Sequence, residues 1–219
     1  MTDYQELKES GRRITLNSIE IIVLLLLPLP FLHLNVLYVV SALVIMLLSK
    51  YIRNEKWQDY GFKSVNQKGI LIAITIGIVF GFADNFLVEP LITKLVGAEP
   101  DLSSYKGVQG SLMGLIGMLA LGWVVGGIFE EFFFRGYLYN RIESLIRNPR
   151  LFKITAILLT SIVFAFAHDY QGIGGIADTF LFAIVIGSLY FYLGRNVWYI
   201  ILIHGFYDTI GIFMLYHGH

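Results

Sequence analysis

Long apolar runs follow one another along most of this chain and limit its fold more than any other feature. They cover residues 14–32, 31–49, 69–88, 111–134, 154–167, 176–193 and 197–216, the fourth continuing as an amphipathic helix to about 146. A helix needs about 20 apolar residues to cross a bilayer. Hydrophobic residues make up 56% of the chain, while 15% are charged, against about 25% in an ordinary soluble domain. The sequence therefore predicts an all-α, polytopic integral membrane protein with about seven transmembrane helices.

The same arithmetic excludes several classes of protein. The spans use most of the 219 residues, so we expect one membrane domain over residues 1–219 and no separate soluble domain. A net charge of zero gives no reason to expect a nucleic-acid partner, and the lack of cysteine excludes disulfides, thiolate metal sites and a Cys nucleophile. No internal repeat supports an inverted-repeat transporter.

Charges in the loops predict how the chain is oriented. Cationic clusters at 8–13, 50–68 and 135–153 and the single Arg195 fall on one side of the predicted spans, whereas the segment 89–110 has few cations and is predicted to be an external loop. The positive-inside rule then places the N-terminus in the cytoplasm and, with seven crossings, the C-terminus outside. The first two runs are predicted to form a hairpin that turns within residues 28–35.

A small set of ionisable residues lies within or at the ends of the spans. Such groups are costly in a bilayer and usually face a cavity or a partner, so each is a functional candidate. They are Glu130, Glu131 and Arg135 in the fourth run, His168 at the end of the fifth, and His204 and Asp208 in the seventh.

Helix geometry separates the roles of the two glutamates. Neighbouring residues point about 100° apart, so Glu130 and Glu131 cannot face the same point. Glu131 and Arg135 are four residues apart and are predicted to form an ion pair, which leaves Glu130 without a local cation and suits it to a general base. His204 and Asp208 also share a face, and Phe164 lies one turn before His168, where it can pack on the imidazole.

Two kinds of chemistry fit this set. In the first, Glu130 and a histidine deprotonate a water while the other histidine and Asp208 stabilise the oxyanion that forms on a carbonyl group. In the second, Glu130, His168 and His204 bind Zn²⁺, and the metal-bound water is the nucleophile.

The ordered set Glu130-Glu131-x-x-x-Arg135, Phe164-x-x-x-His168 and His204-x-x-x-Asp208 resembles the three motifs of the CPBP family, the CAAX proteases and bacteriocin-processing enzymes, also called the Abi family. The resemblance covers residues 111–216, and the stretch Trp57-x-x-Tyr60-Gly61-Phe62 is also typical. It implies that Glu130 and His168 activate water, that His204 and Asp208 form the oxyanion site, and that Glu131, Arg135 and Phe164 support them.

The resemblance also implies a function and a location. It predicts an intramembrane endopeptidase with its catalytic cavity between the fourth, fifth and seventh spans and with no cofactor, zinc being the alternative. The expected partners are the lipid bilayer and a peptide or protein substrate that can be prenylated. The small chain is similar to bacterial members in a plasma membrane, which implies leader- or signalling-peptide processing or bacteriocin self-immunity. A non-catalytic membrane partner or immunity protein is the alternative from another class.

Overall fold

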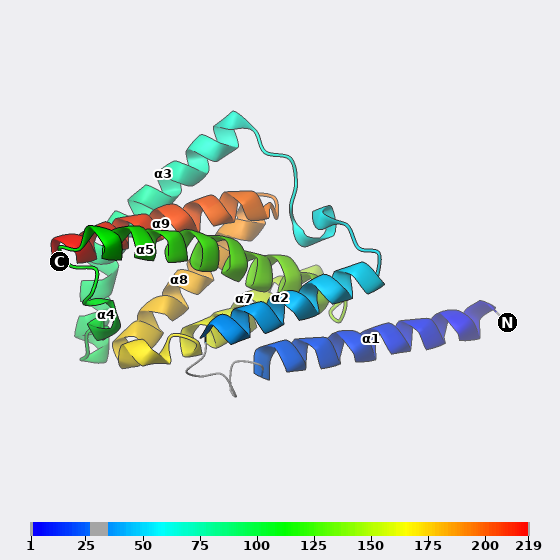
Figure 1. Ribbon diagram of the computed structural model, residues 1–219. Helices are drawn as coiled ribbons and strands as arrows, with labels where there is room; N and C mark the ends of the chain where they lie inside the picture. The colour runs from blue at the N-terminus through cyan, green and yellow to red at the C-terminus, as the bar shows by residue number, and fades with distance from the viewer. Residues whose placement is uncertain (1, 27–34, 219) are drawn as a thin grey trace.

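Residues 2–26 and 35–218 are described by the computed structural model, and they form helices joined by short connections (Figure 1). The first pair is α1 (Thr2–Leu26) and α2 (Asn35–Ile52). Most of the turn predicted within 28–35 lies outside the described residues. A short 3₁₀ turn, Trp57–Tyr60, lies in the connection that follows α2.

The rest of the described chain is also helical. The elements are α3 (Gln67–Ala83), α4 (Glu89–Val96), α5 (Leu112–Leu121), α6 (Tyr139–Glu143), α7 (Pro149–Phe166), α8 (Gly172–Tyr192) and α9 (Val197–His217). Widened π-type turns, Asp84–Val88, Gly122–Glu130 and Phe132–Leu138, join α3 to α4 and α5 to α6. Single 3₁₀ turns lie at Ser103–Tyr105 and Asp169–Gln171. The predicted all-α class is confirmed for the described residues.

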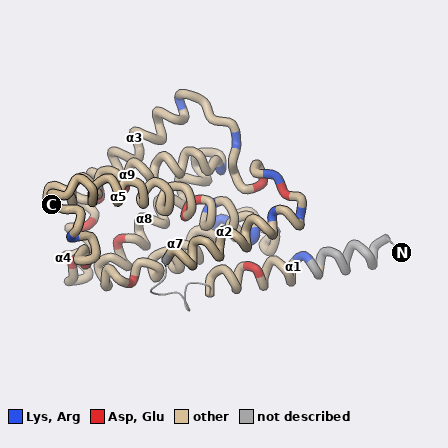
Figure 2. Tube along the Cα trace, viewed as in Figure 1, with Lys and Arg blue, Asp and Glu red and all other residues tan. Residues whose placement is uncertain are grey.

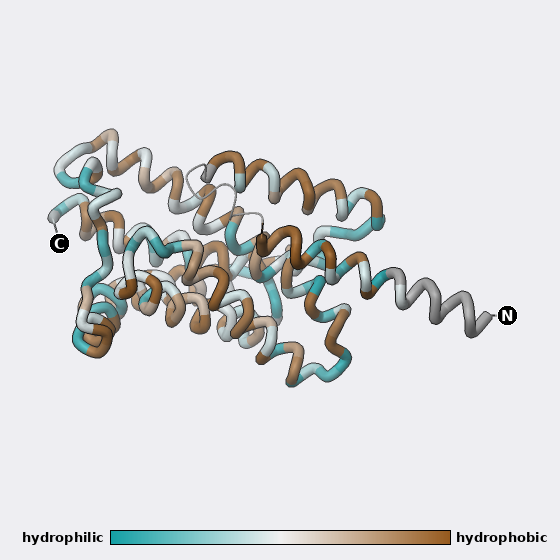
Figure 3. The backbone as a smooth tube through the Cα atoms, turned by 90° about the horizontal axis from the view of Figure 1, so that it is seen from below, coloured by the Kyte–Doolittle hydropathy of each residue, from teal (hydrophilic) through white to brown (hydrophobic). Residues whose placement is uncertain are grey.

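Five of these helical stretches are long and apolar enough to cross a membrane, counted within the described residues. They are Gln67–Val96, Leu112–Glu143, Pro149–Phe166, Asp169–Tyr192 and Val197–His217, and Val36–Ile52 is a shorter apolar helix. Lys and Arg gather mainly at the end of the molecule where α2 ends and α3 begins (Figure 2). Hydrophobic residues run along the helices and hydrophilic residues mark the connections (Figure 3). This pattern indicates an integral membrane protein.

The helix that begins with α3 is longer than the sequence predicted. An end at residue 88 was expected because Glu89 and Pro90 follow, but the helix continues to Val96. Pro90 has no backbone N–H to donate within the helix. The π-type turn Asp84–Val88 lies directly before Glu89 and Pro90, where the regular bonding pattern is already altered. The connection to α5 therefore starts at residue 97, and α4 turns away from the line of α3 (Figure 1).

Helix α8 also begins earlier than predicted. The sixth apolar run begins at residue 176, yet α8 starts at Gly172. Only residues 167–171 separate it from α7, and they contain the 3₁₀ turn Asp169–Gln171. His168 consequently lies in a short, tightly turned link between two helices.

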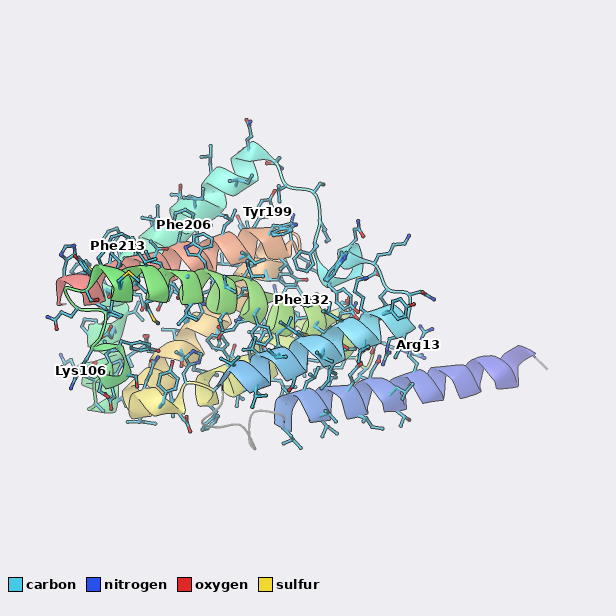
Figure 4. All side chains as sticks on the ribbon, viewed as in Figure 1. Arg13, Lys106, Phe132, Tyr199, Phe206 and Phe213 are labelled. Atoms are coloured by element: carbon cyan, nitrogen blue, oxygen red, sulfur yellow. The ribbon has the colours of Figure 1, made fainter. Side chains whose placement is uncertain are left out.

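Helices α3 and α9 pack closely along their length. A Cβ atom on Gly77 would lie 2.6 Å from the backbone oxygen of Ile203, and one on Gly81 would lie 2.8 Å from Cβ of Ile210. Small residues allow the backbones of membrane helices to approach in this way. The contact fixes the position of α9, which carries His204 and Asp208. Tyr199, Phe206 and Phe213 mark the course of this helix in Figure 4.

A buried arginine joins the N-terminal helices to the rest of the bundle. The side chain of Arg141 on α6 is 1% exposed; its Nε donates to Glu20 of α1 at 2.8 Å, and its Nη1 and Nη2 donate to Glu55 at 2.7 and 2.8 Å. Its guanidinium also lies 4.4 Å from the ring of Tyr137. Arg141 was predicted to belong to a cytoplasmic loop cluster, but its charge is neutralised inside the protein.

Glu55, in the connection after α2, shows the electrostatic consequence of this network. Burial alone would raise the pKa of its carboxyl group. Hydrogen bonds from Arg141 and Tyr60 and the charge of Arg141 outweigh burial, so the pKa lies below its usual value. The ionised form of Glu55 is therefore part of the folded structure.

Candidate active site

The site residues come from three helical stretches. Glu130, Glu131 and Arg135 lie in the π-type region between α5 and α6, His168 lies just after α7, and His204 and Asp208 lie in α9. Phe182 of α8 packs among them, with its ring centroid 4.8 Å from that of His204. π-type turns are rare and often occur at functional sites.

Glu131 is the centre of the hydrogen bonds in this region. Its Oε1 accepts from Nη1 of Arg135 at 2.9 Å, which is the predicted ion pair, and it lies 2.6 Å from Nδ1 of His204. The side chains of Glu131 and Arg135 are both 0% exposed, and Nη2 of Arg135 also donates to the backbone oxygen of Ala183 at 3.2 Å. The contact between Glu131 and His204 was not predicted from the sequence. Glu131 therefore has a direct contact with one of the candidate histidines.

His204 lies between two carboxylates. Nε2, on the other side of the ring from Glu131, lies 3.5 Å from Oδ1 of Asp208, and the Asp208 side chain is 23% exposed. Gly126 leaves the space for this pair, because a Cβ atom there would lie 2.6 Å from Oδ2 of Asp208 and 3.3 Å from Nε2 of His204. The predicted shared face of His204 and Asp208 is present.

His168 has a different environment from His204. Its Nδ1 lies 2.8 Å from the backbone oxygen of Phe164. Its ring is also close to the Phe164 ring, at 4.7 Å between centroids, as the spacing of the two residues predicts. Phe164 in turn lies 6.4 Å from the ring of His204. One phenylalanine therefore contacts or faces both candidate histidines.

Glu130 is near these groups without a direct bond to them. Within the described residues, no hydrogen bond joins Glu130 to His168 or to His204. Its carboxyl group is within electrostatic range of His204 and Asp208. Glu130 is thus left free of the pairing that occupies Glu131.

The zinc alternative can be tested against the side chains that are present. Among residues 2–26 and 35–218, no three His, Cys, Asp or Glu side chains gather closely enough to hold a metal ion. As arranged in this structure, Glu130, His168 and His204 do not form the zinc site that the alternative mechanism requires.

A buried hydrogen bond between Tyr207 and Asp84 lies next to the site, and it was not predicted from the sequence. The hydroxyl of Tyr207 donates to Oδ2 of Asp84 at 2.6 Å, and the Tyr207 ring lies 4.5 Å from Phe182, which faces His204. Asp84 lies near the end of the apolar run 69–88, yet it is 4% exposed and lies inside the long helix Gln67–Val96. Its charge in an apolar run was the signal that sequence reasoning could have used.

Comparison with known proteins gives one match. Residues 112–210 match the family model of the Rce1-like type II CAAX prenyl endopeptidases. A search of the curated proteins and a search of the solved structures found no match. The matched segment contains every candidate site residue from Glu130 to Asp208, and the resemblance predicted from the three motifs is confirmed.

Proposed function

Because the chain belongs, through residues 112–210, to the Rce1-like type II CAAX prenyl endopeptidase family, we propose that it is an intramembrane endopeptidase in which Glu130 and His168 activate the attacking water. Membership of this family implies an intramembrane protease. The observation that best supports the assignment of roles is the contrast between the two histidines, which have different hydrogen-bond partners.

The partner of His168 suits it to accept a proton. A backbone carbonyl oxygen can only accept a hydrogen bond, so Nδ1 of His168 carries the hydrogen that it shares with Phe164. In the neutral ring Nε2 is then left with its lone pair. This nitrogen is the proton acceptor that a water-activating histidine needs.

The partners of His204 suit it to donate. Glu131 accepts the hydrogen on Nδ1, and Nε2 points toward Asp208. A histidine whose two nitrogens both face carboxylates is arranged as a donor rather than as a base. We propose that His204 carries a hydrogen on both nitrogens and forms the oxyanion site with Asp208, while Glu131 and Arg135 hold His204 in place.

The proposed reaction proceeds in two balanced steps. Glu130, assisted by His168, takes a proton from water as the water oxygen bonds to the carbonyl carbon of the scissile peptide, and the carbonyl oxygen becomes an oxyanion held by His204 and Asp208. The proton then passes from Glu130 to the amide nitrogen, the oxyanion re-forms the carbonyl group, and the carbon–nitrogen bond breaks. The products are a carboxylic acid and an amine, and the acid passes its proton to the released amine. No covalent enzyme intermediate is needed.

We further propose the setting of this reaction. The chain forms one membrane domain over residues 1–219, with seven spans that include α1 and α2 and with its N-terminus in the cytoplasm. The catalytic cavity lies between Leu112–Glu143, α7 and α9. The substrate is a membrane-associated peptide or protein, either a prenylated CAAX-type protein or a bacterial leader or signalling peptide, and a role in bacteriocin self-immunity uses the same chemistry in a bacterial plasma membrane.

A peptide-library assay tests the proposed function. Purified protein in liposomes is incubated with membrane-associated peptides, and new termini are mapped by mass spectrometry. We expect cleavage by the unaltered protein and by the control Glu99→Gln, which changes an exposed loop carboxylate, and no cleavage by folded Glu130→Ala or His168→Ala. A complete lack of cleavage by the unaltered protein would favour the non-catalytic partner. Full activity of both site variants would overturn the proposed mechanism.

A further inference from the structure

The connection 97–111, which was predicted to be a plain external loop, is bonded to the link that carries His168. The backbone N–H of Asp101 donates to the carbonyl oxygen of Gln171 at 2.8 Å. The hydroxyl oxygens of Tyr105 and Tyr170 lie 2.5 Å apart, and Nε2 of Gln171 donates to both hydroxyls, at 3.3 Å to Tyr105 and 3.2 Å to Tyr170. We call these contacts of Asp101, Tyr105, Tyr170 and Gln171 the tyrosine clasp.

The clasp is attached to the two other stretches that carry site residues. Tyr105 packs against a small apolar cluster formed by Val108, Leu115 of α5 and Ile212 of α9. The backbone N–H of Gly110 also donates to the carbonyl oxygen of Tyr216 in α9, at 3.0 Å. One side chain, Tyr105, therefore connects the helices that carry Glu130 and His204 with the link that carries His168.

The tyrosine clasp lies at the opposite end of the molecule from the cationic residues of α1, such as Arg13. Lys106, which follows Tyr105, and Arg13 of α1 are labelled at opposite ends in Figure 4. The link between α7 and α8, in yellow, lies at the same end as α4 (Figure 1).

The position of His168 depends on this link because the residue lies outside a helix. Helix α7 ends at Phe166, so His168 lacks the continuous helical bonding that fixes Glu130 and His204. Two aromatic rings lie near its ring, with centroids 4.7 Å away for Phe164 and 5.8 Å away for Tyr170. Phe164 is held by α7, but Tyr170 is 45% exposed, and its hydroxyl is bonded to Tyr105 and Gln171.

We propose that Tyr105 is a positioning residue for the reaction and that it acts through the hydroxyl of Tyr170 to hold the His168 ring where it can take the proton of the attacking water. This inference rests on the proposed function. Tyr105 precedes the segment matched by the family, residues 112–210, so the family match does not assign it a role.

A pair of hydroxyl deletions tests the proposal. Tyr105→Phe and Tyr170→Phe each remove one oxygen of the clasp and keep the ring, and Tyr192→Phe, at an exposed tyrosine on α8, is the matched control. We expect each clasp variant to lower kcat about fivefold to tenfold, the range that the loss of one hydrogen bond represents, with KM unchanged. The loss in the double variant should fall well short of the product of the two single losses, because both deletions break the Tyr105–Tyr170 bond and only the bonds from Gln171 differ.

A measurement without substrate separates the clasp from the proposed function. Hydrogen exchange of the backbone amides of Asp101 and Gln171, both bonded to this link, should be faster in Tyr105→Phe than in the unaltered protein and unchanged in Tyr192→Phe. If the unaltered protein cleaves nothing, the proposed function fails while the exchange rates still report on the clasp.

Several results would overturn the proposal. They are an unchanged kcat or unchanged exchange in Tyr105→Phe, losses that multiply in the double variant, or a rise in KM in place of the fall in kcat. The last of these would assign the tyrosines to substrate binding.

Discussion

Gly126 leaves space for the Asp208 side chain, so adding a single carbon atom at residue 126 should disturb the site. Alanine at this position adds one Cβ atom, which would lie 2.6 Å from Oδ2 of Asp208. To reach an ordinary contact of 3.4 Å, the Asp208 carboxyl group must move by about 0.8 Å. A displacement of about 1 Å in a catalytic group can reduce a rate about 100-fold. We therefore expect Gly126→Ala to lower kcat/KM by about two orders of magnitude.

Stability should respond much less than activity. Overpacking costs about 1–3 kcal/mol, while replacing a helical glycine by alanine recovers about 1 kcal/mol. The assay compares peptide cleavage and thermal unfolding of Gly126→Ala with those of Gly117→Ala. Gly117 is the matched control because it lies in α5 and a Cβ atom there meets nothing within 4 Å. The reasoning is refuted if Gly126→Ala keeps its activity, or if Gly117→Ala loses as much.

Two further predictions concern buried charges. Arg135→Met leaves Glu131 buried without the arginine that pairs with it, so unfolding in detergent should show a loss of stability of about 3–5 kcal/mol. Adding Glu131→Leu should recover most of this loss. No recovery in the double variant would contradict the ion-pair account. Because the pKa of Glu55 is lowered by folding, its bonds to Arg141 and Tyr60 contribute stability above its unfolded pKa of about 4.3, and this contribution disappears as pH falls through the lower folded pKa. Unfolding temperatures of Glu55→Gln should consequently depend less steeply on pH below about 5, and an equal slope would refute this role.

Local spacing was enough to predict several contacts of the site. The ion pair of Glu131 with Arg135 joins residues four positions apart within a helical stretch, and Phe164 contacts His168 four positions on, just beyond the end of α7; both contacts are present. Such contacts depend on helix geometry alone, so the sequence determines them wherever a helix forms.

Contacts between distant segments could not be predicted in the same way. The bond between Glu131 and His204 joins residues 73 positions apart, and Glu131 lies between two π-type turns. No residue pattern predicted those turns. Tyr105 carried no signal either, because its partner Tyr170 is 65 positions away and both hydroxyls lie in polar connections.

Proline and charge misled the prediction in two places. Glu89 and Pro90 predicted a helix end, but the π-type turn before them allows the helix to continue, which puts Asp84 inside the span. Arg141 was counted as a loop cation because Arg147 and Arg150 follow it. Its partners Glu20 and Glu55 come from other elements, so its burial depends on tertiary packing that hydropathy does not describe.

The rate of Glu130→Gln tests the central claim most directly. Glutamine keeps the size and shape of the side chain but cannot take a proton from water. With a peptide that the unaltered protein cleaves, and with an unchanged unfolding temperature, the account predicts a kcat lower by a factor of about 10² to 10⁴. A folded Glu130→Gln variant that cleaves this peptide within about threefold of the unaltered rate would contradict the assignment of Glu130 as the base.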